Sequence, residues 1–277
     1  MKKIVLTALL GSTALFGSSL HFSSDNTDIA VVAEQTTVND ITVSNTRTDF
    51  ALGTHTAMAS AQYIYNGDVS IVNVPLGYNI TDNVGLEVNF PFVQVKSDFA
   101  ETQRGMGDIS VGANYHFGNY ESASGLNLTT LRYKTTTGDE DKALGTGKAA
   151  YTLSHNFAKE VGGGFRFHAL AAYTLNDKEV LGNAYNLMFG TSMPCLLNDN
   201  VRTNVKVVYF NMDENDFDMN GLTTADVWVE WNTQNLLQYV PLGFGVKIPL
   251  MNETTAFGTT ADADKTVLFY VSVGSFF

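Results

Sequence analysis

The sequence predicts an all-β protein, a closed antiparallel transmembrane β-barrel of about 12 strands with short periplasmic turns and longer outer loops. Three observations lead to this prediction. Apolar and polar residues alternate in segments of roughly ten residues, short and long breaks separate these segments in turn, and the C-terminal segment is apolar on one face. Successive side chains of a strand point to opposite faces, so alternation gives the apolar outside and mixed inside that a closed barrel needs.

The alternating segments begin near Thr56 and continue to the end of the chain. They lie at 56–65, 69–80, 84–95, 107–117, 125–134, 148–158, 164–174, 181–192, 200–210, 222–231, 239–249 and 265–277. In the fourth segment, Val111 shares the apolar face with Tyr115, whereas Asn114 and His116 share the polar face. Aromatic rings stand near strand ends on the apolar faces, at Tyr115, Phe117, Tyr173, Tyr209 and Trp231. This placement is typical of the aromatic girdles at the two surfaces of a membrane.

The breaks between the segments alternate in length. The short ones are 81–83, 118–124, 159–163, 197–200 and 232–235, and the longer ones are 96–105, 135–147, 211–221 and 251–264. With both termini in the periplasm, the short breaks become periplasmic turns and the long ones become outer loops. Asn66-Gly67-Asp68 is the exception, because it is a tight hairpin signal at the place of the first outer loop.

The C-terminal segment carries a signal of its own. Phe269, Val271 and Val273 share one face, and the chain ends on Phe277. This ending resembles the terminal strand of bacterial outer-membrane proteins, which closes on an aromatic residue that the barrel-assembly machinery reads. Ser275 departs from that pattern, because the family often has an aromatic residue there. The resemblance predicts that Phe269, Val271, Val273 and Phe277 form a membrane-assembly signal.

The N-terminus predicts export. Two lysines precede an apolar run at 4–16, and small residues follow at 17–19. This run is shorter than the about 20 residues that a membrane-spanning helix needs. We therefore expect a signal peptide at 1–19, a barrel at 54–277, and delivery to the cell outer membrane. Residues 20–53 alternate poorly, and both a periplasmic leader and a plug inside the lumen remain open for them.

Composition excludes several classes of protein. The formal net charge is -12 and the pI is about 4.7, so we expect no nucleic-acid partner, because binding phosphate needs clustered Lys and Arg. No apolar segment after the signal is long enough for a transmembrane helix. Cys195 is the only cysteine, so no internal disulfide is possible.

Several stretches together resemble one family. They are Thr48-Asp49-Phe50, the hairpin at 75–92, Gly105-Met106-Gly107-Asp108 with the strand that follows to Phe117, Thr137-Gly138, and Leu144-Gly145-Thr146-Gly147. They resemble outer-membrane proteins associated with the meta-cleavage pathway of phenol degradation, often described as transporters. The resemblance covers residues 46–277, although the proline that many relatives have after Thr48 is missing. It implies an outer-membrane barrel and suggests uptake of small hydrophobic or aromatic compounds.

Gly105-Met106-Gly107 does not predict a phosphate-binding loop. It precedes a strand, so no helix N-terminus is offered to an anion. We interpret it as a device that starts the strand, with Asp108 pointing inward or capping a loop.

The polar faces of the strands supply candidate lumen or selectivity residues. These are Glu87, Asp108, Asn114, His116, Arg166, His168, Arg202, Lys206, Glu230 and Lys247. In a 12-stranded ring, the acidic strands at 84–95 and 107–117 face the basic strands at 164–174 and 200–210. Two interpretations stay open: a transverse field across a pore that selects solutes by charge, or a buried network of paired charges that fills a narrow lumen.

Two outer breaks hold acidic clusters, at Asp139-Glu140-Asp141 and at 213–218. Oxygen-rich clusters suit divalent cations, but neither has the spacing of a dedicated calcium loop. We expect solvated loops there, bridged by divalent ions to lipopolysaccharide phosphates, and neither a metal site nor a cofactor.

Ser154-His155-Asn156 suggests a hydrolase, yet adjacent strand residues point to opposite faces and cannot form a triad among themselves. No enzyme is expected.

The sequence thus favours a channel or transporter that passes small, hydrophobic or aromatic, molecules across the outer membrane. The alternative is a plugged structural or surface-interaction barrel that acts through its outer loops, and an outer-membrane hydrolase is third. The expected partners are outer-membrane lipid, lipopolysaccharide, the barrel-assembly machinery and a small-molecule solute.

Overall fold

A computed structural model describes residues 57–65, 69–96, 102–117, 125–142, 144–179, 181–195, 198–218, 221–232, 242–262 and 267–276. The predicted signal peptide, the segment at 20–53 and Phe277 lie outside these described residues. Within the described ranges, no helix is long and apolar enough to span a membrane.

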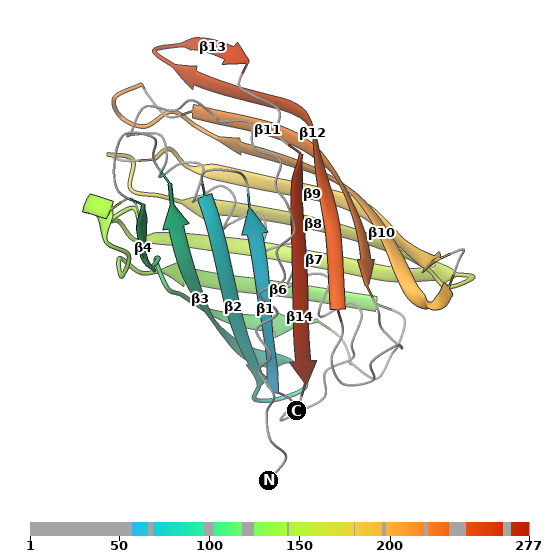
Figure 1. Cartoon of the computed structure of the whole chain (residues 1–277). Coiled ribbons are helices and arrows are strands. Elements are labelled where there is room, and N and C mark those ends of the chain that lie inside the picture. Colours follow the sequence, from blue (N-terminus) through green and yellow to red (C-terminus); the bar gives the residue numbers. More distant parts are fainter. Residues whose placement is uncertain are drawn as a thin grey trace.

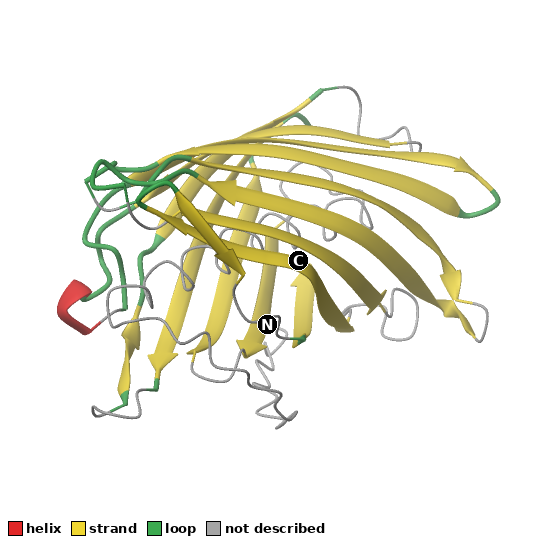
Figure 2. Cartoon of the chain, turned by 90° about the horizontal axis from the view of Figure 1, so that it is seen from above, coloured by secondary structure: helices red, strands yellow, loops and turns green. Residues whose placement is uncertain are grey.

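The described residues form one 14-stranded sheet (Figure 1). Its strands are β1 (Ala57–Tyr65), β2 (Val69–Asn79), β3 (Val84–Val95), β4 (Gln103–Met106), β5 (Ser110–His116), β6 (Gly125–Lys134), β7 (Ala150–Gly162), β8 (Phe165–Leu175), β9 (Ala184–Cys195), β10 (Asn198–Met212), β11 (Gly221–Asn232), β12 (Leu242–Ala256), β13 (Thr259–Asp262) and β14 (Leu268–Phe276). A 3-10 turn, η2 (Glu140–Lys142), stands between β6 and β7. In Figure 2 this turn marks the end of the barrel at which most of the described loops lie.

The strand pairings close the sheet into a ring. Neighbouring strands pair antiparallel from β1 to β12, with β5 following β3 because β4 stands aside. β12 pairs with both β11 and β14, and β14 pairs back onto β1, for example Met58 with Phe276. Leaving out β4 and β13, the ring has 12 of the 14 strands. The predicted closed antiparallel barrel is therefore confirmed, and no ring strand is left with an open edge.

Side chains alternate across the wall as the sequence predicts. On β7, Tyr151 and Leu153 are 53% and 55% exposed, whereas Ser154 and Asn156 between the outward positions are buried. Aromatic rings pair on the outer face: Tyr115 with Phe117, Tyr133 with Tyr151, Tyr185 with Tyr209 and Trp231 with Phe244. The outer face is therefore apolar and aromatic, and the polar side chains lie on the inner face.

Two of the predicted outer loops contain strands, which corrects their assignment. The break at 251–264 is a hairpin, because β12 continues to Ala256 and turns at Phe257-Gly258 into β13. Both turn residues have positive φ, 52° and 67°, which suits a two-residue hairpin, but a phenylalanine in place of Asn or Asp hides this from the sequence. The break at 96–105 likewise contains β4, which pairs with the outer end of β3.

Candidate functional site

The inner wall holds all ten predicted lumen residues. Glu87 lies on β3, Asp108 just before β5, Asn114 and His116 on β5, Arg166 and His168 on β8, Arg202 and Lys206 on β10, Glu230 on β11 and Lys247 on β12. Seven of these are buried, and Glu87, Arg166 and Arg202 are partly buried. The parity of each strand thus places its polar side chains as expected, but it does not decide which of them meet.

The ion pairs run along the wall rather than across the lumen. Four pairs on the inner wall join Arg132 to Glu87, Lys134 to Asp108, Lys206 to Glu230 and Lys247 to Asp226, at 2.8, 3.1, 2.8 and 3.4 Å. Each partner comes from the same or a nearby strand. This geometry favours the paired network over the transverse field. Arg132, Lys134 and Asp226 were missed by the sequence reasoning, although Asp226 shares the parity of Glu230, and Arg132 and Lys134 share the parity of the polar Thr130.

The Arg132–Glu87 pair spans an intervening strand. Arg132 donates through Nε and Nη2 to Glu87 Oε1 at 2.9 and 2.8 Å. Gly112 on β5 lies opposite both residues in the ladders. A Cβ at Gly112 would stand 2.8 Å from Glu87 Cγ, so only glycine leaves room for the side chains to meet over β5.

A second buried pair lies across β10 and β11. Lys206 Nζ donates to Glu230 Oε2 at 2.8 Å, and the two side chains are 0% and 1% exposed. The Lys206 stem crosses Gly190 on β9, where a Cβ would come within 2.6 Å of its Cγ. Lys247 Nζ stands 5.9 Å from the ring centroid of Trp228, which also faces inward. The Lys206 and Glu230 charges are so deeply buried that each needs the other to be stable.

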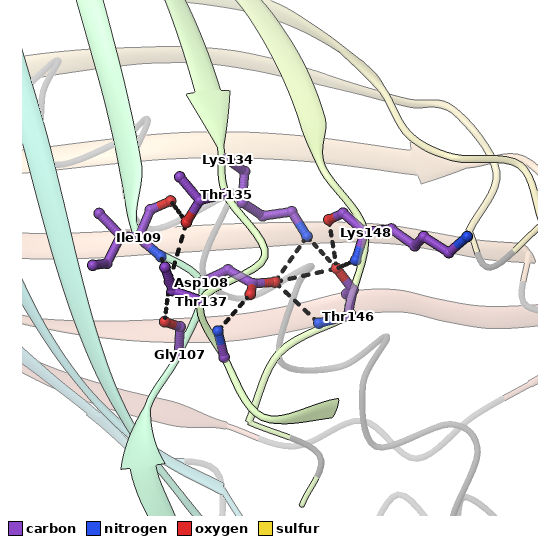
Figure 3. Close-up of polar contacts among 9 residues, drawn as sticks. Gly107, Asp108, Ile109, Lys134, Thr135, Thr137, Thr146 and Lys148 are labelled. Carbon is purple, nitrogen blue, oxygen red and sulfur yellow. Dashed lines mark hydrogen bonds and ion pairs between the residues drawn. The ribbon is translucent and has the colours of Figure 1, made fainter. Parts of the chain in front are cut away.

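Asp108 is a node that joins the wall to the outer loop after β6 (Figure 3). Its Oδ1 accepts the Gly138 backbone N–H at 2.9 Å. Its Oδ2 accepts the Thr146 backbone N–H at 3.0 Å and the Lys134 ammonium at 3.1 Å, and the Thr146 hydroxyl lies 3.2 Å away. Lys134 also donates to the Thr146 hydroxyl. Of the two sequence interpretations of Asp108, capping of a loop describes these contacts.

Threonines extend this node along the same loop. Thr137 Oγ1 accepts the Ile109 N–H at 2.8 Å and donates to the Gly107 carbonyl at 3.1 Å. Thr135 Oγ1 donates to the Ile109 carbonyl at 2.8 Å. The motifs around Gly107, Thr137 and Thr146, far apart in the sequence, therefore form one structural unit (Figure 3).

Glycines let the loop fold tightly against Asp108. A Cβ at Gly145 would stand 2.5 Å from Asp108 Oδ1, and one at Gly138 would stand 2.7 Å from the Gly145 backbone. Leu144 packs closely against Gly105 of β4. A Cβ added at Gly105 would stand only 2.7 Å from Leu144 Cδ1. Leu144 itself is only 3% exposed.

Apolar side chains form a cluster on the inner wall. It contains Ile71, Val93, Val95, Leu144, Leu170, Ala172, Met188, Val208 and Trp228. The members come from β2 and β3 on one side of the ring and β8 to β11 on another, with Leu144 contributed by the loop. The sequence reasoning assigned the inner face by its polar residues and missed this cluster. The available signal was that apolar residues such as Leu170 and Val208 share the parity of the polar residues His168 and Lys206 on their strands.

Arg202 braces a turn at the opposite end of the wall. Its Nε donates to Ser192 Oγ and its Nη2 to the Gly164 carbonyl, both at 2.8 Å. Gly162, Gly163 and Gly164 all have positive φ, so this turn between β7 and β8 depends on glycine. His168 lies on the same inner wall and is 1% exposed.

The Ser154-His155-Asn156 stretch is divided between the two faces of β7. Ser154 and Asn156 point inward and are buried, whereas His155 points outward and its Nδ1 lies 2.9 Å from Thr129 Oγ1, so the three cannot form a triad.

In the outer loop, Lys142 donates to Asp139 at 2.5 Å, which lowers the pKa of Asp139. No group of acidic, His or Cys side chains in the described part of the chain is placed to hold a metal ion.

Comparisons with solved structures identify the fold, whereas comparisons by sequence find no match. No protein-family model and no curated protein sequence matches the chain. An outer membrane channel from Pseudomonas putida F1 is similar in structure, with a TM-score of 0.60 and 13% identity over 82% of this chain and 96% of that chain. KdgM porin and NanC porin each have a TM-score of 0.52, at 8% and 6% identity, over 79% of this chain and 98% of theirs. The chain therefore has the fold of the outer-membrane channel and porin barrels.

Proposed function

We propose that this protein is an outer-membrane channel that passes small hydrophobic or aromatic molecules. The observation that carries the proposal is the apolar cluster on the inner wall, from Ile71 and Val93 to Met188 and Trp228. Water-filled porins have a polar interior, whereas an apolar stretch of wall suits a solute that leaves water readily. The channels and porins of the same fold support passage through the barrel, and the resemblance to the phenol-degradation proteins supports an aromatic solute.

The outer surface supports placement in a membrane. Apolar side chains such as Leu131 and Leu153 are more than half exposed in the middle of strands, where water would disfavour them. Paired rings such as Trp231 with Phe244 suit an interfacial girdle. With the export signal at 1–19, this surface supports the outer membrane as the location, with lipid and lipopolysaccharide as its surroundings. Insertion by the barrel-assembly machinery through Phe269, Val271, Val273 and Phe277 belongs to the same proposal.

The test is solute flux into liposomes that carry the refolded protein. Phenol or toluene is compared with a small sugar, and empty liposomes give the background. We expect the aromatic solute to cross faster than the background and to gain more from the protein than the sugar does. A larger gain for the sugar would contradict the proposed substrate class and leave a general pore.

A plugged barrel that acts through its outer loops is the second candidate. The observation that favours it is the burial of the inner wall, where His116, His168, Asn204 and Lys206 are at most 2% exposed. Inner side chains of an open aqueous pore would be reached by solvent. Absence of flux for both solutes would support this candidate and contradict the channel.

A further inference from the structure

We propose that the outer loop at 135–149 forms the constriction of the channel, with Leu144 as its selectivity residue and Asp108 as the residue that positions it. This inference rests on the proposed channel function and assigns the control of passage to named side chains. Leu144 lies in the inner apolar cluster although it belongs to a loop, and its neighbours Val93 and Val95 stand at the outer end of β3. A solute that enters from outside meets this side chain among the first apolar groups of the wall.

The position of Leu144 depends on one polar node. The Asp108 carboxylate accepts backbone N–H groups on both sides of Leu144, from Gly138 at 2.9 Å and from Thr146 at 3.0 Å. Both acceptor oxygens belong to the barrel wall, so the loop is drawn inward at two points by a single side chain. Charge-assisted hydrogen bonds of this kind are the strong ones. Lys134 holds the carboxylate from the wall side at 3.1 Å.

Apart from the node, the loop is held near its two ends, by Thr135 and Thr137 at one end and by Lys148 at the other. Its tip, η2, has no buried residue, and Asp139, Glu140 and Lys142 face solvent or each other. Gly145 and Gly147 flank Thr146, and Gly147 has φ of 65°, a backbone conformation that favours glycine. Within the described part of the loop, Leu144 is the only member of the inner apolar cluster. Loss of the Asp108 contacts therefore removes the side-chain anchor nearest to Leu144 on both sides of it.

The space around Leu144 is matched to it. A Cβ at Gly105 would meet Leu144 Cδ1 at 2.7 Å, and a Cβ at Gly107 would meet the Leu144 carbonyl at 3.0 Å. The Gly105-Met106-Gly107-Asp108 stretch thus supplies both the room for Leu144 and the anchor for its loop. This explains why two glycines and an aspartate stand together before β5.

The first experiment measures the position of the loop independently of transport. The full chain carries Leu144→Cys with Cys195→Ser, in liposomes, with Asp108 intact or as Asp108→Asn. Asparagine cannot accept all four donors, so modification by a membrane-impermeant thiol reagent should be about tenfold or more faster in the Asp108→Asn protein. The matched control is Asp139→Cys at the exposed tip, which should react equally fast in both backgrounds.

Equal rates at position 144 in the two backgrounds would overturn the positioning role of Asp108. Folding of each variant is checked by its heat-dependent migration in gel electrophoresis. If Asp108→Asn does not fold, Thr146→Val replaces it, because it removes the hydroxyl contacts to Asp108, Lys134 and the Lys148 backbone and keeps both backbone N–H contacts to the carboxylate.

The second experiment measures selectivity in the same liposomes. Leu144→Ala should raise sugar flux about tenfold while the flux of phenol rises much less, because a constriction excludes the larger polar solute most. Asp139→Asn, at the solvent-exposed tip, is the control and should leave both fluxes unchanged. If the unaltered protein passes phenol and Leu144→Ala changes neither flux, the constriction is wrong and the channel stands. If no protein passes either solute, the channel itself is wrong, and the constriction falls with it even if the thiol rates differ.

Discussion

At the scale of single residues, the inner wall is governed by charges that find partners close by. Glycine is what allows these partners to meet, since Gly112 lies under the Arg132–Glu87 pair and Gly190 lies under the Lys206 stem. In a medium with little water, an ion without its partner is very unfavourable, so the pairing constrains the fold as well as the lumen.

The Lys206–Glu230 pair gives the clearest residue-scale prediction. Lys206→Ala should lower the free energy of unfolding by about 3–5 kcal/mol, because it removes the ammonium group that pairs with a buried carboxylate. The double change Lys206→Met with Glu230→Gln should recover most of that loss, because it removes both charges and keeps the volume. Urea unfolding in vesicles, followed by circular dichroism, measures both. Lys178→Ala, at an exposed lysine, is the control, and a double variant as unstable as the single one would contradict this account.

At the scale of elements, outer loops are tied to strands and to each other. β12 and β13 form a hairpin that projects beyond the neighbouring strands (Figure 1). The Phe257 N–H donates to the Asp218 carbonyl at 2.5 Å, which joins this hairpin to the loop after β10. Lys148 joins the loop before β7 to the loop after β8, at 3.3 Å from both Asp177 and Glu179.

The Lys148 contacts predict a wide pH window for this junction. The Glu179 backbone N–H, followed by Lys148, lowers the pKa of Asp177, and hydrogen bonds to Glu179 and Asp177 raise the pKa of Lys148. The Asp177 contribution is present above its unfolded pKa of about 3.9 and is lost as the pH falls through the lower folded value. The Lys148 contribution is present below about 10.4 and is lost as the pH rises through the higher folded value.

Hydrogen exchange of the Glu179 amide, which donates to Asp177 at 3.1 Å, measures the acid side of this window. After correction for the intrinsic rate, protection should stay constant from about pH 5 to about pH 9 and fall only below about pH 4. Lys148→Gln should move this acid midpoint only slightly, because the backbone hydrogen bond is the larger cause. Loss of protection already near neutral pH would show that Asp177 is not held in this way.

At the scale of the whole molecule, ring closure divides every strand into a face toward lipid and a face toward the lumen. The two tryptophans of the sequence lie on opposite faces of β11. Trp228 is 1% exposed on the inner wall, and Trp231 stacks on Phe244 outside, with ring centroids 5.2 Å apart. Residues three apart in a strand point in opposite directions, so this arrangement follows directly from the ladder.

The tryptophans test the orientation of the wall in a membrane. In liposomes of brominated lipid, the fluorescence of the Trp228→Phe protein, which keeps Trp231, should be strongly quenched. The Trp231→Phe protein, which keeps Trp228, should be quenched little, because its indole lies inside the barrel. Liposomes without bromine give the reference intensity for each variant. Equal quenching of the two would contradict the assignment of faces.

The sequence by itself determined the class of the molecule, its approximate ring strands and the inward face of the ten polar side chains that it singled out. Strand alternation depends only on local geometry, so the inward positions of Glu87, His168 and Lys206 could be read without knowing their neighbours. The assembly signal at Phe277, the leader at 20–53 and the signal peptide stay predictions.

Only the tertiary structure decided which of these side chains meet. Register and strand tilt place Arg132 beside Glu87 and Lys134 beside Asp108, and neither follows from parity. The same holds for Leu144, whose loop sequence is polar and glycine-rich and carries no period that could place it inside. Its position comes from hydrogen bonds between residues 30 and 38 positions apart, at Asp108 with Gly138 and with Thr146. Such contacts form only when β5, β6 and β7 pair in register, because this pairing brings Asp108 beside the loop between β6 and β7.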